Sequence, residues 1–276
     1  NLVSRSFPGH VAIRFLESIE EGGAQSELTY ACFVEKIRAT ANLLVKLASS
    51  RPNIALIVPN TPEAQIALWA AEVAGTAMPI NPLLPDHHVG ALLRAAESTI
   101  LIVENDLERA TALRKLAPNV SHVFTLDPGP CCIADARRLE AKDRFEMAPS
   151  ITGDDPVIAQ FHTGGTTGVP KLALHRQSNQ ISAAMGAIDR MRLVDEDVII
   201  NPLPLFHVAG SICIGLAPIL AGACQILVTR LGGRTPGFFE QFWPIISQHS
   251  VSIVAGVPTI ISEAAARLPE TAPASV

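Results

Sequence analysis

Short apolar runs alternate with helix-length amphipathic stretches along most of this 276-residue chain, and this alternation constrains the fold more than any other feature. The first clear unit is an apolar run over 54–58, a turn at 59–60 and a predicted helix over 62–74. That helix has a good start, because Thr61 offers a capping hydroxyl and Pro62 suits the first helical position. Further apolar runs and predicted helices follow at 77–80, 86–96, 99–103, 107–116 and 123–126. The pattern predicts an α/β fold with parallel strands.

A polar connector over 127–156 interrupts this series, and the alternation then resumes. The later predicted helices and extended segments cover 179–191, 198–200, 238–248, 251–254 and 259–267. Residues 198–229 carry no formal charge, but prolines and glycines interrupt them. We therefore expect a buried helix from about 209 to 221 there rather than a transmembrane span.

Composition excludes several classes of function. The net charge is −5 and no cluster of lysines or arginines occurs, so the chain offers no electrostatic footprint for nucleic acid. The five cysteines are odd in number and lack C-x-x-C spacing, which predicts reduced thiols in a cytoplasmic protein. Peripheral association with a membrane stays an open alternative.

A segment rich in glycine and threonine follows the apolar run 157–159. Glycine amides can approach phosphate oxygens closely because glycine lacks Cβ, and threonine hydroxyls and a lysine ammonium add further donors. Each hydrogen bond to an ionised acceptor contributes about 1.5–3 kcal/mol, so a handful can hold a polyphosphate tail. The candidate nucleotide-binding residues are Thr163, Gly164, Gly165, Thr166, Thr167, Gly168 and Lys171.

The spacing differs from that of a P-loop, in which the lysine directly follows the last glycine and a helix begins. Here Lys171 comes three residues after Gly168, and Pro170 disfavours a helix across this point. A strand–turn–strand with a returning strand over 172–175 fits better, which speaks against a kinase-like or NTPase phosphate binder. A flexible surface loop is the plainer alternative for a generic cluster of this kind.

From Thr163 to Lys171 the segment resembles the phosphate loop of the adenylate-forming superfamily, the AMP-binding acyl-CoA synthetases. That loop reads approximately (Tyr/Phe)-Thr-(Ser/Gly)-Gly-Thr-Thr-Gly-x-Pro-Lys-Gly. Two departures flank the match, because His162 stands where an aromatic residue is usual and Leu172 replaces the closing glycine. A second match covers 202–210, which is similar to the family's Pro-Leu-Phe-His-x-x-Gly segment, and a weaker one covers 256–259.

The resemblance implies that the loop, with Lys171, binds the β- and γ-phosphates of ATP. It implies that Phe206, His207 and Gly210 shape the acyl site, with His207 and Lys171 as the candidate catalytic residues. In amino-acid-activating relatives an aspartate typically follows the phenylalanine, whereas here His207 occupies that place. The implied substrate is a carboxylic acid without an α-amino group, such as a fatty or aryl acid. Taken alone, a histidine in an apolar stretch is more often a satisfied core residue.

The resemblance covers essentially the whole chain and implies that residues 1–276 form the N-terminal part of an AMP-binding domain. It implies one sheet-and-helix lobe over 53–182 and a second made of 1–52 and 183–276. The family's Tyr-Gly-x-Thr-Glu element, whose glutamate holds Mg²⁺, is absent because the sole tyrosine, Tyr30, is followed by alanine. The C-terminal lid domain with the adenylation lysine is also absent. We therefore expect a truncated N-terminal fragment that is inactive by itself and whose Mg²⁺ ligand lies outside this chain.

The implied parent activity is that of an AMP-forming acyl-CoA synthetase, which uses ATP, a carboxylic acid, here a fatty acid by expectation, and coenzyme A. Two alternatives stay open: another adenylate-forming enzyme such as an aryl-acid ligase, and a non-catalytic nucleotide-binding or interaction protein that keeps half of the fold. The sequence gives no metal site, and it is silent on acyl chain length, the coenzyme A site and the oligomeric state.

Overall fold

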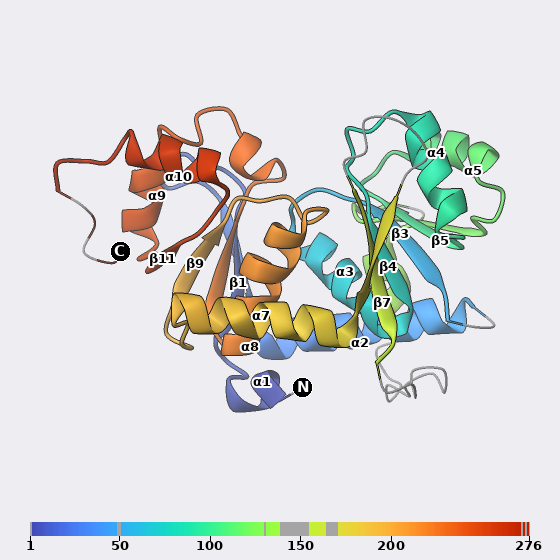
Figure 1. The fold of residues 1–276 in the computed structure, drawn as a ribbon, viewed down its shortest axis with the longest axis horizontal. Coiled ribbons are helices and arrows are strands. Elements are labelled where there is room, and N and C mark those ends of the chain that lie inside the picture. Colours follow the sequence, from blue (N-terminus) through green and yellow to red (C-terminus); the bar gives the residue numbers. More distant parts are fainter. Residues whose placement is uncertain are drawn as a thin grey trace. The chain divides into compact units, whose positions relative to one another are not determined.

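A computed structural model describes residues 2–48, 51–129, 131–138, 155–163, 171–271, 273 and 275. The chain divides into two compact units (Figure 1). Unit 1 comprises Asn1–Val34, Asn60–Pro62 and Ile181–Val276, and unit 2 comprises Glu35–Pro59 and Glu63–Gln180. Among the described helices, none has the length and apolar character needed to cross a membrane.

Unit 2 contains a six-stranded sheet in the order β6-β5-β3-β4-β7-β8. All neighbouring pairs are parallel except β7 and β8, which are antiparallel. Its strands are β3 (Asn53–Ile57), β4 (Thr76–Pro79), β5 (Ile100–Val103), β6 (His122–Thr125), β7 (Val157–His162) and β8 (Leu172–Arg176). Its helices are α3 (Pro62–Ala74), α4 (Asp86–Ala95), α5 (Leu107–Leu116) and α6 (Ile133–Arg138).

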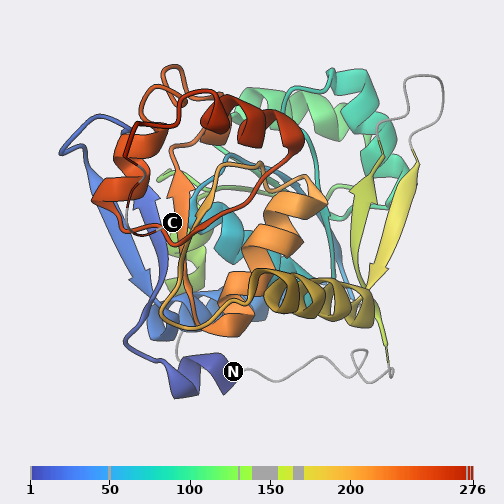
Figure 2. The ribbon, with the colours of Figure 1, turned by 60° about the vertical axis from the view of Figure 1, so that its left-hand side comes forward.

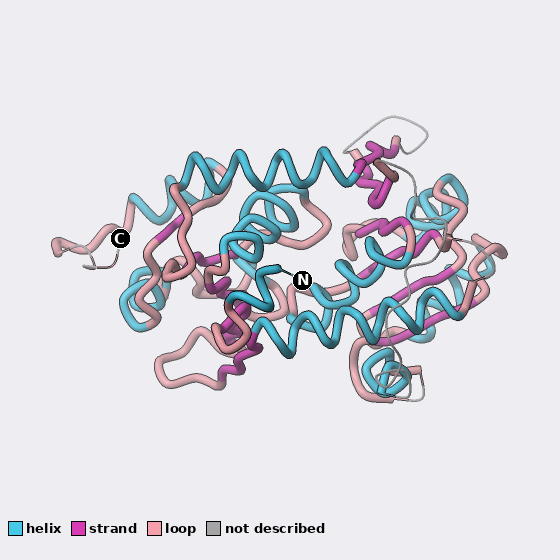
Figure 3. The backbone as a smooth tube through the Cα atoms, turned by 90° about the horizontal axis from the view of Figure 1, so that it is seen from below, coloured by secondary structure: helices cyan, strands magenta, loops and turns pink. Residues whose placement is uncertain are grey.

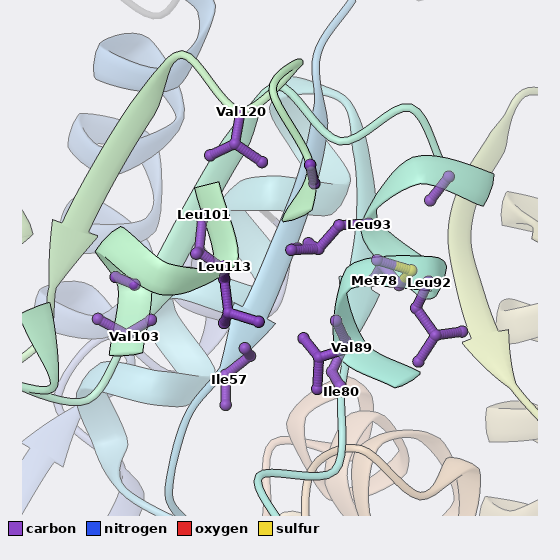
Figure 4. Packing of buried hydrophobic residues seen from close by; sticks show 14 residues of the cluster. Ile57, Met78, Ile80, Val89, Leu92, Leu93, Leu101, Val103, Leu113 and Val120 are labelled. Carbon is purple, nitrogen blue, oxygen red and sulfur yellow. The ribbon is translucent and has the colours of Figure 1, made fainter. Parts of the chain in front are cut away.

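The core of unit 2 follows from its sequence pattern. Strands β4 and β5 are buried at every position, as expected for parallel strands covered on both faces. Helices α4 and α5 cover one face with a cluster that includes Val89, Leu93 and Leu113 (Figure 4). Arg109 joins the start of α5 to the start of α4, because its guanidinium donates to Asp86 Oδ1 at 2.8 Å.

Unit 1 contains a five-stranded sheet in the order β11-β9-β10-β1-β2. Only the β1–β2 pair is antiparallel, and Figure 2 shows these blue strands beside the orange β10. The strands are β1 (Val11–Leu16), β2 (Gln25–Thr29), β9 (Val198–Asn201), β10 (Cys224–Val228) and β11 (Ile253–Val254). The helical segments are α1 (Leu2–Ser6), η2 (Ala209–Leu216), α8 (Ala217–Ala221), η3 (Gly232–Arg234), α9 (Phe242–Gln248) and α10 (Pro258–Ala265).

Two helices carry the chain from one unit to the other. Helix α2 (Tyr30–Lys46) begins in unit 1 and continues into unit 2. Helix α7 (Gln177–Met191) begins in unit 2 directly after β8, as Figure 3 shows, and continues into unit 1.

The predicted α/β class is confirmed, and most elements lie within a few residues of their predicted bounds. The helix predicted over 238–248 was placed too early, because it begins at Phe242 and residues 235–241 form turns. The buried helix predicted from 209 to 221 has the correct extent, but its first eight residues form the π-helix η2. The short helix α6 lies within the polar connector, where no helix was predicted.

The two units differ from the expected lobes in residues 35–52, 60–62 and 181–182. Hydrogen bonds explain the first two differences. Lys36 on α2 donates to Glu63 at 3.2 Å, which joins the second part of α2 to unit 2. The Asn60 amide donates to the carbonyl oxygen of Arg230 at 3.1 Å, which joins the 60–62 segment to unit 1.

Candidate functional site

The predicted phosphate loop connects β7 to β8, which form an antiparallel hairpin in unit 2. The last pair of the ladder is His162 with Leu172, and the Thr163 amide donates to the carbonyl oxygen of Lys171 at 3.0 Å. The structure therefore confirms the returning strand over 172–175, and in the described residues the strand β8, not the helix of a P-loop, is the next element after β7. The other candidate loop residues, Gly164, Gly165, Thr166, Thr167 and Gly168, lie outside the described residues.

Thr163 and Lys171 stand at the two ends of this loop. Both residues are exposed, so the hydroxyl and the ammonium are accessible to a ligand. The hydrogen bond between their backbones fixes the distance between the ends of the loop, whatever side chains lie between them. The pair thus places a cation and a hydroxyl at the mouth of the hairpin. The Thr163 hydroxyl donates to the Lys171 carbonyl oxygen at 3.5 Å, a long bond that it would exchange to donate to an anionic ligand.

His162, which departs from the family's aromatic residue, has a structural partner that the sequence did not reveal. Its Nε2 accepts a hydrogen bond from the Asn81 amide at 3.1 Å. Burial lowers the pKa of His162, which favours the neutral imidazole that this accepting role requires. The bond joins β7 to the segment after β4, and β4 and β7 are themselves parallel neighbours in the sheet.

The helix that leaves the hairpin is held at two points. Asp155, just before β7, accepts from the Ser178 amide at 2.9 Å and from the Ser178 hydroxyl at 2.7 Å. These hydrogen bonds lower the pKa of Asp155. Deeper in the unit, Gln180 Nε2 donates to Glu72 Oε1 on α3 at 2.9 Å, and both residues are buried. The start of α7 is thus tied both to the entry of β7 and to the core.

The Glu72–Gln180 pair is electrostatically unusual. Burial raises the pKa of Glu72 to about 8, so the carboxyl is mostly protonated at neutral pH. Gln180 Oε1 is buried and has no hydrogen-bond partner among the described residues. A protonated Glu72 supplies the O–H donor that such an oxygen needs, which would complete a neutral acid–amide pair.

The second predicted segment, 202–210, leads into the π-helix η2 of unit 1. His207 is exposed, but its backbone is fixed, because its amide donates to the Pro204 carbonyl at 3.1 Å and its carbonyl accepts from the Ser211 amide at 3.0 Å. The Ala209 amide donates to His207 Nδ1 at 3.2 Å. A neutral imidazole that accepts at Nδ1 carries its proton on Nε2, so Nε2–H is a donor available to a ligand.

Phe206 and Gly210 flank this histidine. The Arg234 guanidinium lies over the Phe206 ring, with its carbon 6.0 Å from the ring centroid. Gly210 is buried, and a Cβ there would lie 2.5 Å from the Pro204 carbonyl oxygen, so no larger residue fits without a backbone shift. The structure therefore groups Phe206, His207 and Gly210 at the start of η2, in unit 1, whereas Thr163 and Lys171 belong to unit 2.

Sequence reasoning missed two buried amides next to this segment, Asn201 and Gln225. Asn201 Nδ2 donates to the Gly210 carbonyl at 2.8 Å, and Gln225 Nε2 donates to the Ile214 carbonyl. Each is a polar residue in an otherwise apolar strand, and this feature of the sequence could have predicted a buried, hydrogen-bonded amide.

The described residues contain no group of three or more histidine, cysteine, aspartate or glutamate side chains arranged to hold a metal ion. These residues by themselves therefore offer no cluster of protein ligands for Mg²⁺. All five cysteines are free thiols.

Comparison with known proteins places this geometry in a family. Marinolic acid–CoA ligase of Pseudoalteromonas sp. (strain SANK 73390) is 31% identical over 250 residues, and the alignment covers 84% of this chain and 38% of that protein. Oxalate–CoA ligase of Arabidopsis thaliana is 29% identical over 270 residues, which cover 94% of this chain and 49% of that protein. The chain thus spans less than half the length of these relatives.

The fold is also that of a solved structure, the inhibitor-bound N-terminal domain of FACL13 from Mycobacterium tuberculosis. The TM-score is 0.80 at 22% sequence identity, and the match covers 98% of this chain and 64% of that one. The family model described as AMP-binding enzyme matches residues 3–275. The chain therefore belongs to the AMP-binding enzyme family.

Proposed function

We propose that the protein containing this chain is an ATP-dependent acid–CoA ligase of the AMP-forming type. The observation that carries the proposal is the β7–β8 hairpin, which presents Thr163 and Lys171 at the ends of its loop in a chain of the AMP-binding family. In the reaction, a carboxylate oxygen attacks the α-phosphorus of ATP and pyrophosphate leaves. The coenzyme A thiol then attacks the acyl carbon, AMP leaves and the thiol proton is released.

In this proposal the hairpin binds the polyphosphate. Thr163, Gly164, Gly165, Thr166, Thr167, Gly168 and Lys171 form the candidate set. Donors that are already oriented neutralise the charge that builds up on the departing pyrophosphate, and they need little reorganisation during the reaction. The backbone bond between Thr163 and Lys171 supports this role, since it holds the loop ends together before any ligand binds.

The segment around His207 would bind the acid. Because Ala209 fixes the tautomer, His207 Nε2–H can donate to a carboxylate oxygen and orient it for attack. No carboxylate follows Phe206 that could pair with a substrate ammonium, which supports an acid without an α-amino group. We favour a fatty acid; an aryl acid is the alternative, and the relatives named for marinolic acid and for oxalate suggest a broad range of acids.

Several further elements belong to the proposal. The Mg²⁺ ligand would come from residues outside this chain, and the 276-residue chain alone would be inactive. The two compact units would correspond to the two lobes that the resemblance implies at about 53–182 and at 1–52 with 183–276, within the N-terminal part of an AMP-binding domain. The reduced thiols favour a cytoplasmic location, with peripheral membrane association as an alternative.

The test is a pyrophosphate-release assay on the full natural reading frame that contains this chain, with short, medium, long and aromatic acids and amino acids. Release with non-amino acids, followed by formation of the CoA thioester, is the expected result. Release with amino acids only would overturn the role given to His207. Absence of release with every acid, with ATP still bound, would favour a non-catalytic nucleotide-binding protein. Thioester formation by the 276-residue chain alone would refute the proposed inactivity.

A further inference from the structure

The segment that follows His207 is wound as a π-helix over Ala209–Leu216, visible in orange before α8 in Figure 2. A π-helix closes its hydrogen bonds over five residues instead of four, so it is wider and less stable than an α-helix. Such turns are rare, and they occur often at functional sites. A π-helix of eight residues needs support from its surroundings.

Two strands supply that support from one face of the sheet. In the parallel β9–β10 pair, Asn201 is in register with Leu227 and Gln225 is in register with Ile199. Residues in register share a face, and so do residues two apart on a strand. Asn201 and Gln225 therefore point to the same side of the sheet, two positions apart along it.

Both side chains reach carbonyl oxygens of the π-helix. Asn201 Nδ2 donates to the Gly210 carbonyl at 2.8 Å, and Gln225 Nε2 donates to the Ile214 carbonyl. Each residue is 0% exposed. Burying an amide without such partners costs about 1–3 kcal/mol, so a strand that only packed here would carry apolar residues at both positions.

The glycines of η2 make the close approach that this arrangement requires. A Cβ at Gly215 would lie 2.5 Å from the Gly210 carbonyl oxygen, which is the oxygen that accepts from Asn201. At the other end, the Ala209 amide, which opens η2, is the donor to His207 Nδ1. A change in the winding of η2 would therefore move the amide that sets the histidine tautomer.

We propose that Asn201 and Gln225 are positioning residues. They keep Ala209–Leu216 in the π-helical conformation and thereby fix His207 and Gly210 in the geometry that binds the acid. That this segment binds an acid rests on the proposed function. The positioning itself rests only on the hydrogen bonds within unit 1, so it can be tested without any substrate.

The experiment uses Asn201→Leu and Gln225→Met, which remove the donors and keep side chains of similar length. The matched control is Tyr30→Phe, because the single proton of the buried Tyr30 hydroxyl is also shared between backbone carbonyls of unit 1, that of Ala223 after α8 at 2.8 Å and that of Pro218 in α8 at 3.1 Å. All three variants lose buried hydrogen bonds, and Asn201→Leu also loses the one that the Leu203 amide donates to Asn201 Oδ1 at 3.2 Å. Only the first two variants release carbonyls of η2, and Gln225→Met does so without affecting Leu203. The comparison thus separates positioning from general loss of stability.

The first readout is the rate at which Cys213, a half-buried thiol within η2, reacts with a maleimide, followed by peptide mass spectrometry. We expect this rate to rise about tenfold in Asn201→Leu and Gln225→Met, because the loss of one hydrogen bond to η2 makes local opening of that segment easier. We expect little change in Tyr30→Phe. Equal rates in all three variants would overturn the proposal.

The second readout is the ¹⁵N spectrum of the His207 imidazole, assigned by comparison with His207→Gln. In the unaltered chain and in Tyr30→Phe we expect the form with the proton on Nε2, whereas in Asn201→Leu we expect a mixture of tautomers. An unchanged tautomer in Asn201→Leu would overturn the proposal even if the chain is destabilised. If both readouts respond while the natural protein activates no acid, the proposed function fails and the positioning role stands.

Discussion

The β7–β8 hairpin and the segment around His207 are held in place by different kinds of hydrogen bond. The hairpin is held by the backbone ladder of β7 and β8, whose residues are close in sequence, and it closes with the Thr163–Lys171 bond. The His207 segment is held by Asn201 and Gln225, which donate across the fold to carbonyls of η2.

This difference has a physical consequence. A backbone ladder tolerates side-chain changes, because its hydrogen bonds need only the amide and carbonyl groups of each residue. A helix held by two buried amides and two close-packed glycines depends on particular side chains. Substitutions in the hairpin should therefore alter ligand binding more than folding, whereas substitutions around η2 should alter both.

The largest effect should come from Gly210→Ala. The added methyl group would lie 2.5 Å from the Pro204 carbonyl oxygen and 3.0 Å from Leu203 Cβ, so the backbone must shift. We expect the free energy of unfolding to fall by about 3 kcal/mol, as for an overpacked core, measured by urea denaturation. A fall in unfolding free energy of less than about 0.5 kcal/mol would show that this segment tolerates side-chain changes as the hairpin is expected to.

Lys171→Ala should have its effect on binding and leave stability nearly unchanged, because Lys171 is exposed. Loss of one charge-assisted contact predicts a 10- to 100-fold weaker affinity for ATP, about 1.5–3 kcal/mol, and an unchanged affinity for adenosine. Titration calorimetry on the natural protein measures both. Lys115→Ala, a change on the exposed face of α5, is the control; an equal loss in both variants would remove the hairpin from the nucleotide site.

The Glu72–Gln180 pair is a tertiary anchor of the hairpin's exit helix and gives a pH-dependent test. Because burial raises the pKa of Glu72 from 4.5 to about 8, its contribution is fully present below 4.5 and is lost as the pH rises toward 8. We expect unfolding free energy to fall by about 1 kcal/mol between about pH 6 and pH 7 through this one group.

Glu72→Gln is the variant that tests this, because glutamine keeps the shape and the hydrogen bond to Gln180 but does not titrate. Urea denaturation at both pH values should give a flatter dependence in Glu72→Gln than in the unaltered chain. Identical slopes would mean that Glu72 is ionised in the folded protein.

The smallest effect should come from Gly186→Ala on α7, which also serves as the control for Gly210→Ala. A Cβ at Gly186 would meet nothing within 4 Å, and the residue lies within a helix. Alanine restricts the unfolded chain and favours the helix, so we expect a gain of about 0.5–1 kcal/mol in unfolding free energy. A decrease in unfolding free energy instead would show that the face of α7 at Gly186 contacts another part of the protein.

The local features of the molecule could be predicted from the sequence. The returning strand over 172–175 followed from Pro170 and from the position of Lys171, and the structure confirms it as β8, antiparallel to β7. The start of α3 at Pro62 followed from its capping residues. The winding of η2 could not be predicted, because its apolar residues fit an α-helix equally well and its supports, Asn201 and Gln225, come from separate strands.

The sequence by itself thus determined the α/β class, the hairpin and the residues proposed for its loop, since strand and turn preferences act between near neighbours. Only the tertiary structure decided the protonated state favoured for Glu72 and the partner of His162. Burial and distant hydrogen bonds set these properties, and both arise when segments remote in sequence come into contact.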